Sequence, residues 1–178
     1  MFNKLAEKRR SVKVYAQRPV EAEKIDAIIE AALRSPTGKA ARPWAFVVIT
    51  DKDLLKKLSV AKPVGGAFVK DAPVAVVVCG DPSASGLWVE DCSIAAVTMQ
   101  YAAHALGLGS RWAQMNGNNF KEGTTSTQYI AELLGLPKNL IVECIIAIGY
   151  PGEETVPYKK SDLRFDKVSY NHYGQKKA

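Results

Sequence analysis

Residues 87–109, "LWVEDCSIAAVTMQYAAHALGLG", carry the longest helical pattern in the chain, and the fold has to accommodate them. Between residues 94 and 106 only Thr98, Gln100 and His104 interrupt an apolar sequence. A helix that is apolar nearly all round has to be buried on most of its sides. In a chain of 178 residues, we expect part of that burial to come from a second subunit.

Shorter helices and strands alternate on both sides of this segment. Apolar periodicity predicts helices over 3–9, 19–35, 51–59 and 125–137, and short apolar runs predict strands over 45–50, 73–81, 110–115 and 140–151. The apolar stripe of the second helix consists of Ile25, Ile28, Ile29, Ala32 and Leu33. The continuous apolar run over 73–81 predicts a strand that is buried on both faces.

The remaining segments are expected to be irregular. Residues 65–72 should form a loop or short turn, and the basic tail at the end of the chain should lack regular structure. No repeat, low-complexity linker or shift in composition divides the chain. We therefore expect residues 1–178 to form a single domain.

Composition narrows the class of protein. No apolar run reaches the ~20 residues of a membrane-spanning helix, and the N-terminus lacks the apolar stretch of a signal peptide. We therefore expect a cytoplasmic protein with no membrane partner. Cys79, Cys92 and Cys144 lie far apart in apolar segments, which favours buried free thiols. Two histidines without metal-ligand spacing give little support for a zinc hydrolase or a histidine-based triad.

The net charge of +6 is concentrated at the two ends of the chain. Residues 1–42 hold ten Lys and Arg against five Asp and Glu, a net +5. Residues 43–158 hold eight against eleven, a net −3, and residues 159–178 hold six against two, a net +4. This distribution leaves three interpretations: solvated basic tails, a nucleic-acid-binding surface, or a phosphate site built from both ends.

The segment "RRSVKVY", residues 9–15, has the donors that a phosphate requires. Taken alone, it is more typical of a solvated basic face. Arginine, however, presents a planar fork of donors and stays charged, and Ser11 adds a neutral donor. Alternation along an extended segment places Arg9, Ser11 and Lys13 on one side. The segment "GLGSRW" at 107–112 fits neither a Rossmann turn nor a P-loop.

Five pieces of sequence, taken in order, resemble the FMN-dependent nitroreductase family over nearly the whole chain. They are "RRSVKVY", "SPTGKAARPWAFVVI", the Glu90-Asp91 start of the long helix, "ALGLGSRW", and "LGLPKNL" followed by "CIIAIGYPGEE" and a basic tail. Each piece is weak alone, but chance rarely produces all five in this order. The resemblance implies an α+β fold, with a central mixed or antiparallel sheet flanked by helices and the long apolar helix at a homodimer interface.

The resemblance also implies an activity. The protein would be an FMN-dependent oxidoreductase that transfers hydride or electrons from NADH or NADPH to nitroaromatic, quinone or similar small-molecule acceptors. Two FMN molecules would lie at the dimer interface. The flavin carries the chemistry, so no catalytic side chain is required.

Four groups of residues match the flavin-binding positions of the family. The first would bind the phosphate and one edge of the ring: Arg9, Arg10, Ser11 and Lys13. The second would come from the partner subunit: Pro36, Thr37, Gly38, Ala40 and Arg42. The third would lie near the ring: Gly109, Ser110, Arg111 and Trp112. The tail would complete the phosphate site through Lys159 and Lys160, with Arg164 as the second choice.

Several of these positions depart from the family pattern. Thr37-Gly38 stands where Ser-Ser or Ser-Ala is usual, although Thr37 keeps a hydroxyl donor. Ala40 stands where an asparagine is usual and therefore lacks an amide that could hydrogen-bond the flavin. Arg42 replaces a neutral donor with a cation. Arg111 stands where a small or apolar residue is common, and it faces either the substrate or the solvent. The sequence leaves both orientations of Arg111 open.

Two other functional classes compete with the enzyme. A non-catalytic flavin carrier or sensor would bind the same cofactor without turnover. A basic nucleic-acid-binding domain would require a basic patch with exposed aromatic residues. The net charge of −3 over residues 43–158 argues against the latter, so we expect no nucleic-acid partner.

Overall fold

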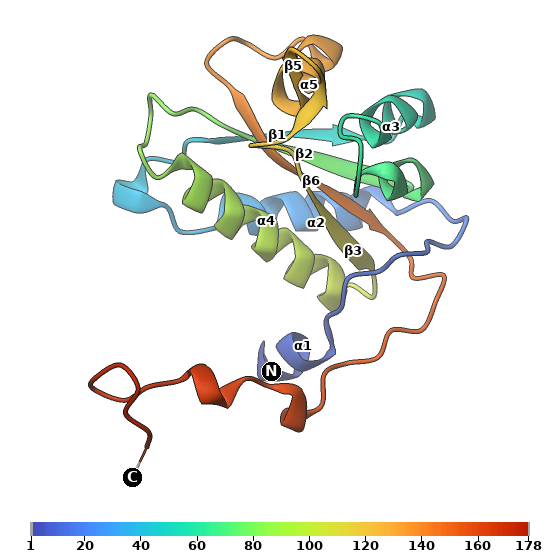
Figure 1. Cartoon of the computed structure of the whole chain (residues 1–178). Helices are drawn as coiled ribbons and strands as arrows, with labels where there is room; N and C mark the ends of the chain where they lie inside the picture. Colours follow the sequence, from blue (N-terminus) through green and yellow to red (C-terminus); the bar gives the residue numbers. More distant parts are fainter. Residues whose placement is uncertain (1, 178) are drawn as a thin grey trace.

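The computed structural model describes residues 2–177 and contains a central four-stranded antiparallel sheet (Figure 1). The strand order is β1 (Trp44–Ile49), β2 (Val74–Gly80), β6 (Ile141–Gly149) and β3 (Gly109–Gln114). Each strand runs antiparallel to its neighbour. The predicted α+β fold is confirmed, and the sheet is the antiparallel one of the two expected types.

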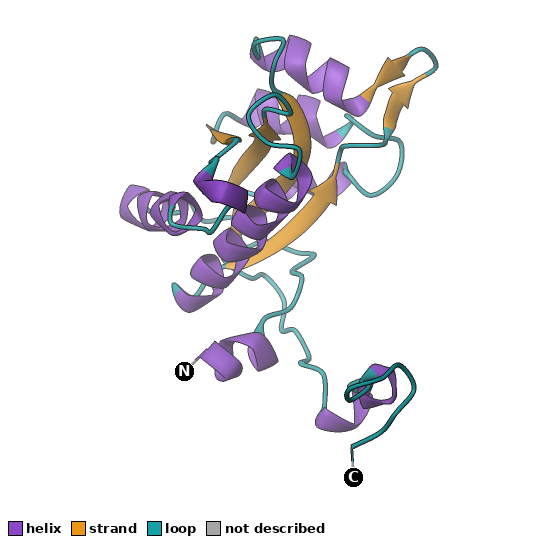
Figure 2. Cartoon of the chain, turned by 90° about the vertical axis from the view of Figure 1, so that its left-hand side faces the viewer, coloured by secondary structure: helices purple, strands orange, loops and turns teal. Residues whose placement is uncertain are grey.

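Helices cover both faces of this sheet (Figures 1 and 2). On one face lie α2 (Ala22–Leu33) and α4 (Trp88–Ala105), and on the other lie α3 (Lys52–Ser59), the 3₁₀ helix η2 (Ala67–Asp71) and α5 (Ser126–Leu134). A short helix, α1 (Phe2–Lys8), stands outside both layers. All five predicted helices are present, and the loop expected at 65–72 contains η2.

The central strands β2 and β6 are buried because both of their faces are covered. Every residue of β2 is buried, as the apolar run over 73–81 predicts. Its side chains alternate between the two layers. Val76 and Val78 face α2 and α4, whereas Ala75 and Val77 face α3 and α5.

Helix α4 lies on the sheet through small and apolar residues, but it is not covered all round. Ala95, Ala96 and Met99 are fully buried. On the opposite side, Ile94 and Val97 retain 38% and 40% of their accessible surface. A single chain thus leaves an apolar stripe uncovered on its longest helix. Within residues 2–177, no helix is both long and apolar enough to cross a membrane.

Local signals fix the ends of two helices. The carboxylate of Asp51 accepts a hydrogen bond from the Leu54 amide (2.8 Å) and caps α3. Thr125 and Gln128 form a capping box at the start of α5. Gly135 ends that helix in the left-handed region with φ of 66°.

The structure corrects several details of the sequence prediction. Residues 119–125 form an unpredicted hairpin, β4 (Asn119–Lys121) and β5 (Thr124–Thr125), which is too short to show an apolar period. Leu33, placed in the buried stripe of α2, is 49% exposed because it is the last residue of the helix. The tail is mostly irregular but contains two 3₁₀ turns, η3 (Lys160–Asp162) and η4 (Phe165–Lys167).

The two ends of the chain leave the body on the same side. Figures 1 and 2 show α1 and the tail beyond residue 152 lying below the two layers. The tail exposes many apolar side chains: Val156, Tyr158, Leu163, Phe165, Val168, Tyr170 and Tyr173. Exposed apolar surface of this extent is typical of a segment that packs against another molecule.

Close packing between the N-terminal segment and β3 makes Gly109 a sensitive position. A Cβ atom at Gly109 would lie 2.3 Å from Cγ2 of Val12. We therefore predict that Gly109→Ala lowers the free energy of unfolding by about 1–3 kcal/mol, the usual range for overpacking. Gly86→Ala is the matched control, because its Cβ would meet nothing within 4 Å. Chemical denaturation measures both variants, and an equal loss in a Val12→Gly background, which removes the Cβ and both Cγ atoms of Val12, would contradict this explanation.

Candidate functional site

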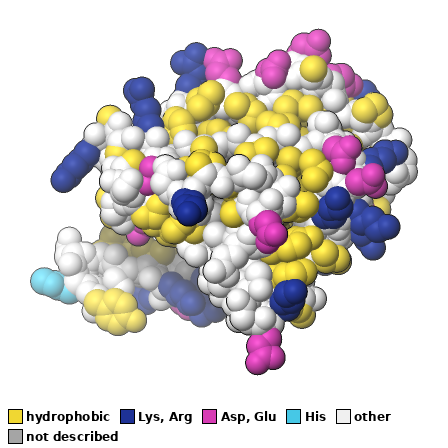
Figure 3. Space-filling model, turned by 90° about the horizontal axis from the view of Figure 1, so that it is seen from above, with side chains coloured by type: hydrophobic (Ala, Val, Ile, Leu, Met, Phe, Trp, Pro, Cys, Tyr) yellow, Lys and Arg dark blue, Asp and Glu magenta, His cyan; other side chains and the backbone are white. Residues whose placement is uncertain are grey.

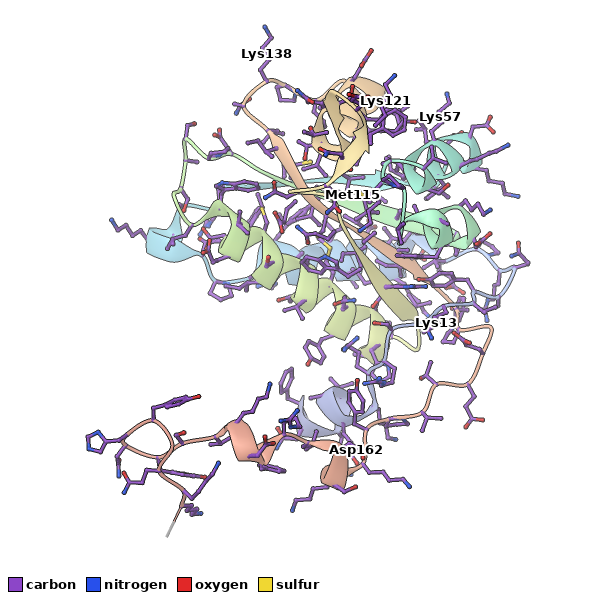
Figure 4. All side chains as sticks on the ribbon, in the orientation of Figure 1. Lys13, Lys57, Met115, Lys121, Lys138 and Asp162 are labelled. Atoms are coloured by element: carbon purple, nitrogen blue, oxygen red, sulfur yellow. The ribbon has the colours of Figure 1, made fainter. Side chains whose placement is uncertain are left out.

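The first and third predicted groups lie side by side. Ser11 forms a parallel bridge with Ser110, and the Val12 amide donates to the Ser110 carbonyl (3.1 Å). The segment around Ser11 and Val12 therefore lies beside the start of β3, at the edge of the sheet. Figure 4 shows Lys13 at this lower end of the sheet, far from Met115, which follows the other end of β3.

The two arginines of the first group contact aromatic rings. The Arg9 guanidinium lies 5.9 Å from the ring centre of Tyr101 on α4. The Arg10 guanidinium lies 3.6 Å from the ring centre of Tyr158 in the tail. The Arg9 amide donates to the Leu5 carbonyl, so Arg9 belongs to the end of α1. The extended segment therefore does not reach Arg9, contrary to the sequence prediction.

The stacking of Arg10 on Tyr158 brings the basic tail to the first group. Lys159 and Lys160 follow Tyr158 directly and are exposed. Arg164, the second choice, is paired with Asp166 through two hydrogen bonds of 2.8 and 2.6 Å. The structure therefore favours the two lysines over Arg164 as partners of an anion.

The cations of the first group have no acidic partner. Within residues 2–177, the side-chain ion pairs involve Arg18, Lys24, Arg34 and Arg164. None of them includes Arg9, Arg10 or Lys13. These three side chains therefore form no ion pair among the described residues at the lower end of the sheet.

Arg111 and Trp112 point to opposite faces of β3. The Arg111 guanidinium lies 4.1 Å from the ring centre of Phe68, and the side chain is half-buried. Neither of the orientations expected from the sequence anticipated this contact. The Trp112 indole N–H donates to Oε1 of Gln114 (2.9 Å) on the side of α4.

The second group lies at the other end of α4. The Gly38 amide donates to Oδ1 of Asp91 (2.8 Å) in the first turn of that helix, and Asp91 is only 2% exposed. Tyr101, which contacts Arg9, lies ten residues further along α4, a rise of about 15 Å. Figure 1 shows the turn η1 (Gly38–Ala40) at one end of α4 and the N-terminal segment near the other. One protomer therefore does not bring the second group to the first and third.

The second group is held in a strained conformation. Lys39, Ala40 and Arg42 have φ values of 51°, 55° and 48°, in the left-handed region that favours glycine. Thr37 supports the loop, because its hydroxyl oxygen accepts from the Arg42 amide (3.1 Å). Strained non-glycine residues of this kind concentrate at binding and catalytic sites.

Two buried polar groups flank this loop without a partner. The Ser35 hydroxyl and the Trp44 indole N–H make no hydrogen bond within the described part of the chain. Buried polar groups in native proteins are almost always satisfied. Both groups beside residues 36–42 thus have hydrogen-bonding capacity that no described residue uses.

Two carboxylates that were not predicted as site residues organise these groups. Asp91, quoted above only as part of the start of the long helix, accepts from the Gly38 amide. Glu143 is 3% exposed at a bulge in β6 and accepts from the side-chain amides of Gln114 (2.8 Å) and Asn116 (3.0 Å). The sequence signal that could have identified Glu143 is its position as the one acidic residue in the apolar run of β6. Through Gln114, Glu143 also fixes the orientation of Trp112.

The three cysteines are buried free thiols, as predicted. Burial raises the pKa of Cys79 and of Cys92 to about 12. Burial, and then the charge of Glu143, raise the pKa of Cys144 well above its ordinary value. These thiols stay protonated near neutral pH and are poor nucleophiles.

Surface hollows lie elsewhere on the protomer. One, of about 650 Å³, lies between α5, Asn116 and the loop 135–138. Another, of about 530 Å³, lies between residues 16–20 and 70–74. Neither is lined by a residue of the four predicted groups.

Comparison with known proteins identifies the family. A sequence model described as "Nitroreductase family" matches residues 6–62 and 56–150. The chain belongs to the nitroreductase family. The resemblance drawn from the five sequence pieces is thereby confirmed, and so is the prediction of an oxidoreductase.

Relatives within the nitroreductase family match most of the chain. An "FMN-dependent Nitroreductase" structure from Clostridium difficile R20291 has a TM-score of 0.93 and 43% identity, covering 95% of this chain and 98% of that one. A "Putative NADH dehydrogenase/NAD(P)H nitroreductase" from Archaeoglobus fulgidus is 36% identical over 86% of this chain and 87% of its own. A protein of the same description from Methanothermobacter thermautotrophicus is 40% identical over 82% and 74%.

The strained loop leads to a stability prediction. Ala40→Gly should raise the free energy of unfolding by about 0.5–1 kcal/mol, because relief of left-handed strain exceeds the added freedom of the unfolded chain. Ala41→Gly is the matched control: its φ is −67°, so it should lower that free energy by about 0.4–1 kcal/mol. Urea unfolding measures the free energy of unfolding of both variants and distinguishes the expected gain from the expected loss. Equal losses in both variants would show that residue 40 is not strained.

Proposed function

We propose that the protein is an FMN-dependent oxidoreductase that transfers hydride or electrons from NADH or NADPH to nitroaromatic, quinone or similar small-molecule acceptors. Family membership and the names of the relatives support the reaction class. The observation that carries the proposal for this chain is the cluster of unpaired cations at the lower end of the sheet. Free thiols in a reducing compartment would fit a cytoplasmic protein.

The residues of this cluster suit a flavin phosphate. Arg9, Arg10 and Lys13 lack carboxylate partners in the described chain, and the Tyr158 contact brings Lys159 and Lys160 nearby. A phosphate monoester accepts several charge-assisted hydrogen bonds from such groups. We infer that the two basic ends of the chain bind it together, as the charge distribution predicts.

We infer that the second group reaches the flavin from a partner subunit. Gly38 and Arg9 lie at opposite ends of α4 in one protomer. The uncovered residues Ile94 and Val97 lie near the middle of that helix. A two-fold axis there would place the first turn of one α4 beside the last turns of the other. That symmetry would bring residues 36–42 of each protomer to the cation cluster of its partner.

The chain supplies binding and orientation rather than acid–base chemistry. FMN, when bound, would provide the hydride and electron chemistry. Gly38 would allow close backbone approach, since a Cβ there would already lie 2.9 Å from Cδ1 of Leu87. Trp112, fixed through Gln114, would form a rigid apolar wall. The buried thiols take no part, because their raised pKa values keep them protonated.

The upper face in Figure 3 gives no support for a nucleic-acid-binding role, while the unpaired cations lie at the lower end of the sheet, outside this view. On the face viewed there, basic and acidic side chains are interspersed and do not form one basic patch. A face of this kind provides no continuous electrostatic footprint for a polyanion.

The absorption spectrum tests the proposed function directly. We predict that the purified protein, soaked with FMN and freed of excess, shows flavin bands that bleach under anaerobic NADPH or NADH. Added nitroaromatic or quinone acceptor should then restore the bands through repeated cycles. Bound flavin that neither donor bleaches would indicate a carrier or sensor. Absence of bound flavin would overturn the proposal.

The dimer has its own test in the uncovered stripe of α4. We predict that Ile94→Glu combined with Val97→Glu abolishes both the dimer and most FMN binding, because charges would replace the apolar contact. Val64→Glu is the matched control, since Val64 is 82% exposed in a loop. Light scattering gives the molecular mass in solution, and the flavin absorbance gives the amount of FMN bound per chain. A double variant that stays dimeric with full flavin content would contradict the proposed interface.

A further inference from the structure

We propose that Glu153 is a positioning residue of the flavin phosphate site, because its carboxylate fixes the backbone that carries Lys13. This inference rests on the function proposed above. Glu153 follows the exit of β6 and lies far from Lys13 in sequence. It contacts no reacting atom in this account and acts only through the N-terminal segment.

One carboxylate oxygen of Glu153 holds two successive amides. Oε1 accepts from the Lys13 amide at 2.7 Å and from the Val14 amide at 3.1 Å. Successive N–H groups that point to one side form an arrangement that binds anions. In this protein, the anion at Lys13 and Val14 is a side chain of the same chain.

These two amides differ from their neighbours, which pair with backbone carbonyls. The Val12 amide donates to Ser110, and the Ala16 amide donates to Tyr150 (2.9 Å). Among the described residues, the Lys13 and Val14 amides donate only to Glu153. Glu153 therefore completes the hydrogen bonding of the segment between β3 and the exit of β6.

The contact changes the direction of the side chains. Regular alternation would bury one of two consecutive residues. Instead, Lys13 and Val14 are both exposed, and Val14 keeps 51% of its surface. The Glu153 contact thus holds the backbone from which the Lys13 side chain leaves. Without the carboxylate, the two amides would turn to water, and the segment that carries Lys13 would lose this anchor.

The backbone around Glu153 is itself held in place by hydrogen bonds and close packing, so its contact with the two amides is well ordered. The Gly152 amide donates to the Val14 carbonyl (2.9 Å), and Tyr15 bridges Pro151. A Cβ at Gly152 would lie 2.9 Å from the carbonyl carbon of Tyr15, so the two backbones approach closely. Because Gly152 has no side chain, the two backbones can approach closely enough for Glu153 to reach the amides.

A positioning role and a purely electrostatic role of Glu153 predict opposite changes in FMN affinity when its carboxylate is removed. A negative charge beside a phosphate site weakens anion binding, so by charge alone any neutral substitution of Glu153 should tighten FMN. If Glu153 positions Lys13, loss of the acceptor should weaken FMN. Glu153→Gln separates the two effects, because the amide oxygen of glutamine can accept both N–H groups without the charge.

The test is an FMN titration of the apoprotein, followed by flavin fluorescence. We expect Glu153→Ala to weaken FMN binding about tenfold, because the Lys13 and Val14 amides lose their shared acceptor. Glu153→Gln should stay within about twofold of the parent protein, since it keeps both N–H bonds. Glu154→Ala is the matched control, because Glu154 is exposed and makes no side-chain hydrogen bond among the described residues. If Glu153→Ala does not fold, Glu153→Met, which keeps the volume and lacks the acceptor, takes its place.

A double-mutant cycle with Lys13→Ala decides whether Glu153 acts through Lys13. We expect Glu153→Ala to cause no further weakening once Lys13 is absent. Additive losses, tighter binding by Glu153→Ala, or a Glu153→Gln loss equal to that of Glu153→Ala would each overturn the inference. If the parent apoprotein binds no FMN, the proposed function itself fails. This outcome is distinct from failure of the Glu153 inference, in which the parent binds FMN but the variants behave otherwise than expected.

Discussion

The packing of α4 against the sheet is the constraint on which the rest of the structure depends. Ala95 and Ala96 let the helix approach β2 and β6 closely, and this contact fills one of the two cores. The same contact turns Ile94 and Val97 outward, where residues 2–177 leave 38% and 40% of their surface uncovered. The helix therefore fixes both the fold of the protomer and the surface through which we expect it to pair.

The two ends of α4 also carry different parts of the candidate site. Asp91 in the first turn holds the strained loop through Gly38, and Tyr101 near the last turn contacts Arg9. Asp91, Glu143 and Glu153 share one kind of role, because each accepts hydrogen bonds from a segment that carries predicted flavin residues. The acidic residues of this site thus position other groups and transfer no proton in our account. That division of labour suits a protein whose chemistry belongs to its cofactor.

Local patterns explain what the sequence could predict. The helices and the buried strand over 73–81 follow from apolar periodicity and from caps such as Asp51, which act over a few residues. The basic ends and the five family pieces located the candidate site. Three features depend on contacts between distant segments and left no local pattern: the left-handed backbone at Ala40, the stacking of Arg111 on Phe68, and the bond from Glu153 to the Lys13 amide.

The central claim is that each flavin lies between the cations of one protomer and the loop 36–42 of its partner, and a mixed dimer tests it most directly. One subunit carries Arg10→Ala with Lys13→Ala, and the other carries Gly38→Val, whose added atoms would meet Leu87. Neither homodimer should bind FMN. The heterodimer, separated by two affinity tags, should bind one FMN per dimer, because one of its two sites contains both unaltered parts. A heterodimer without FMN would show that each site belongs to a single chain and would contradict this account.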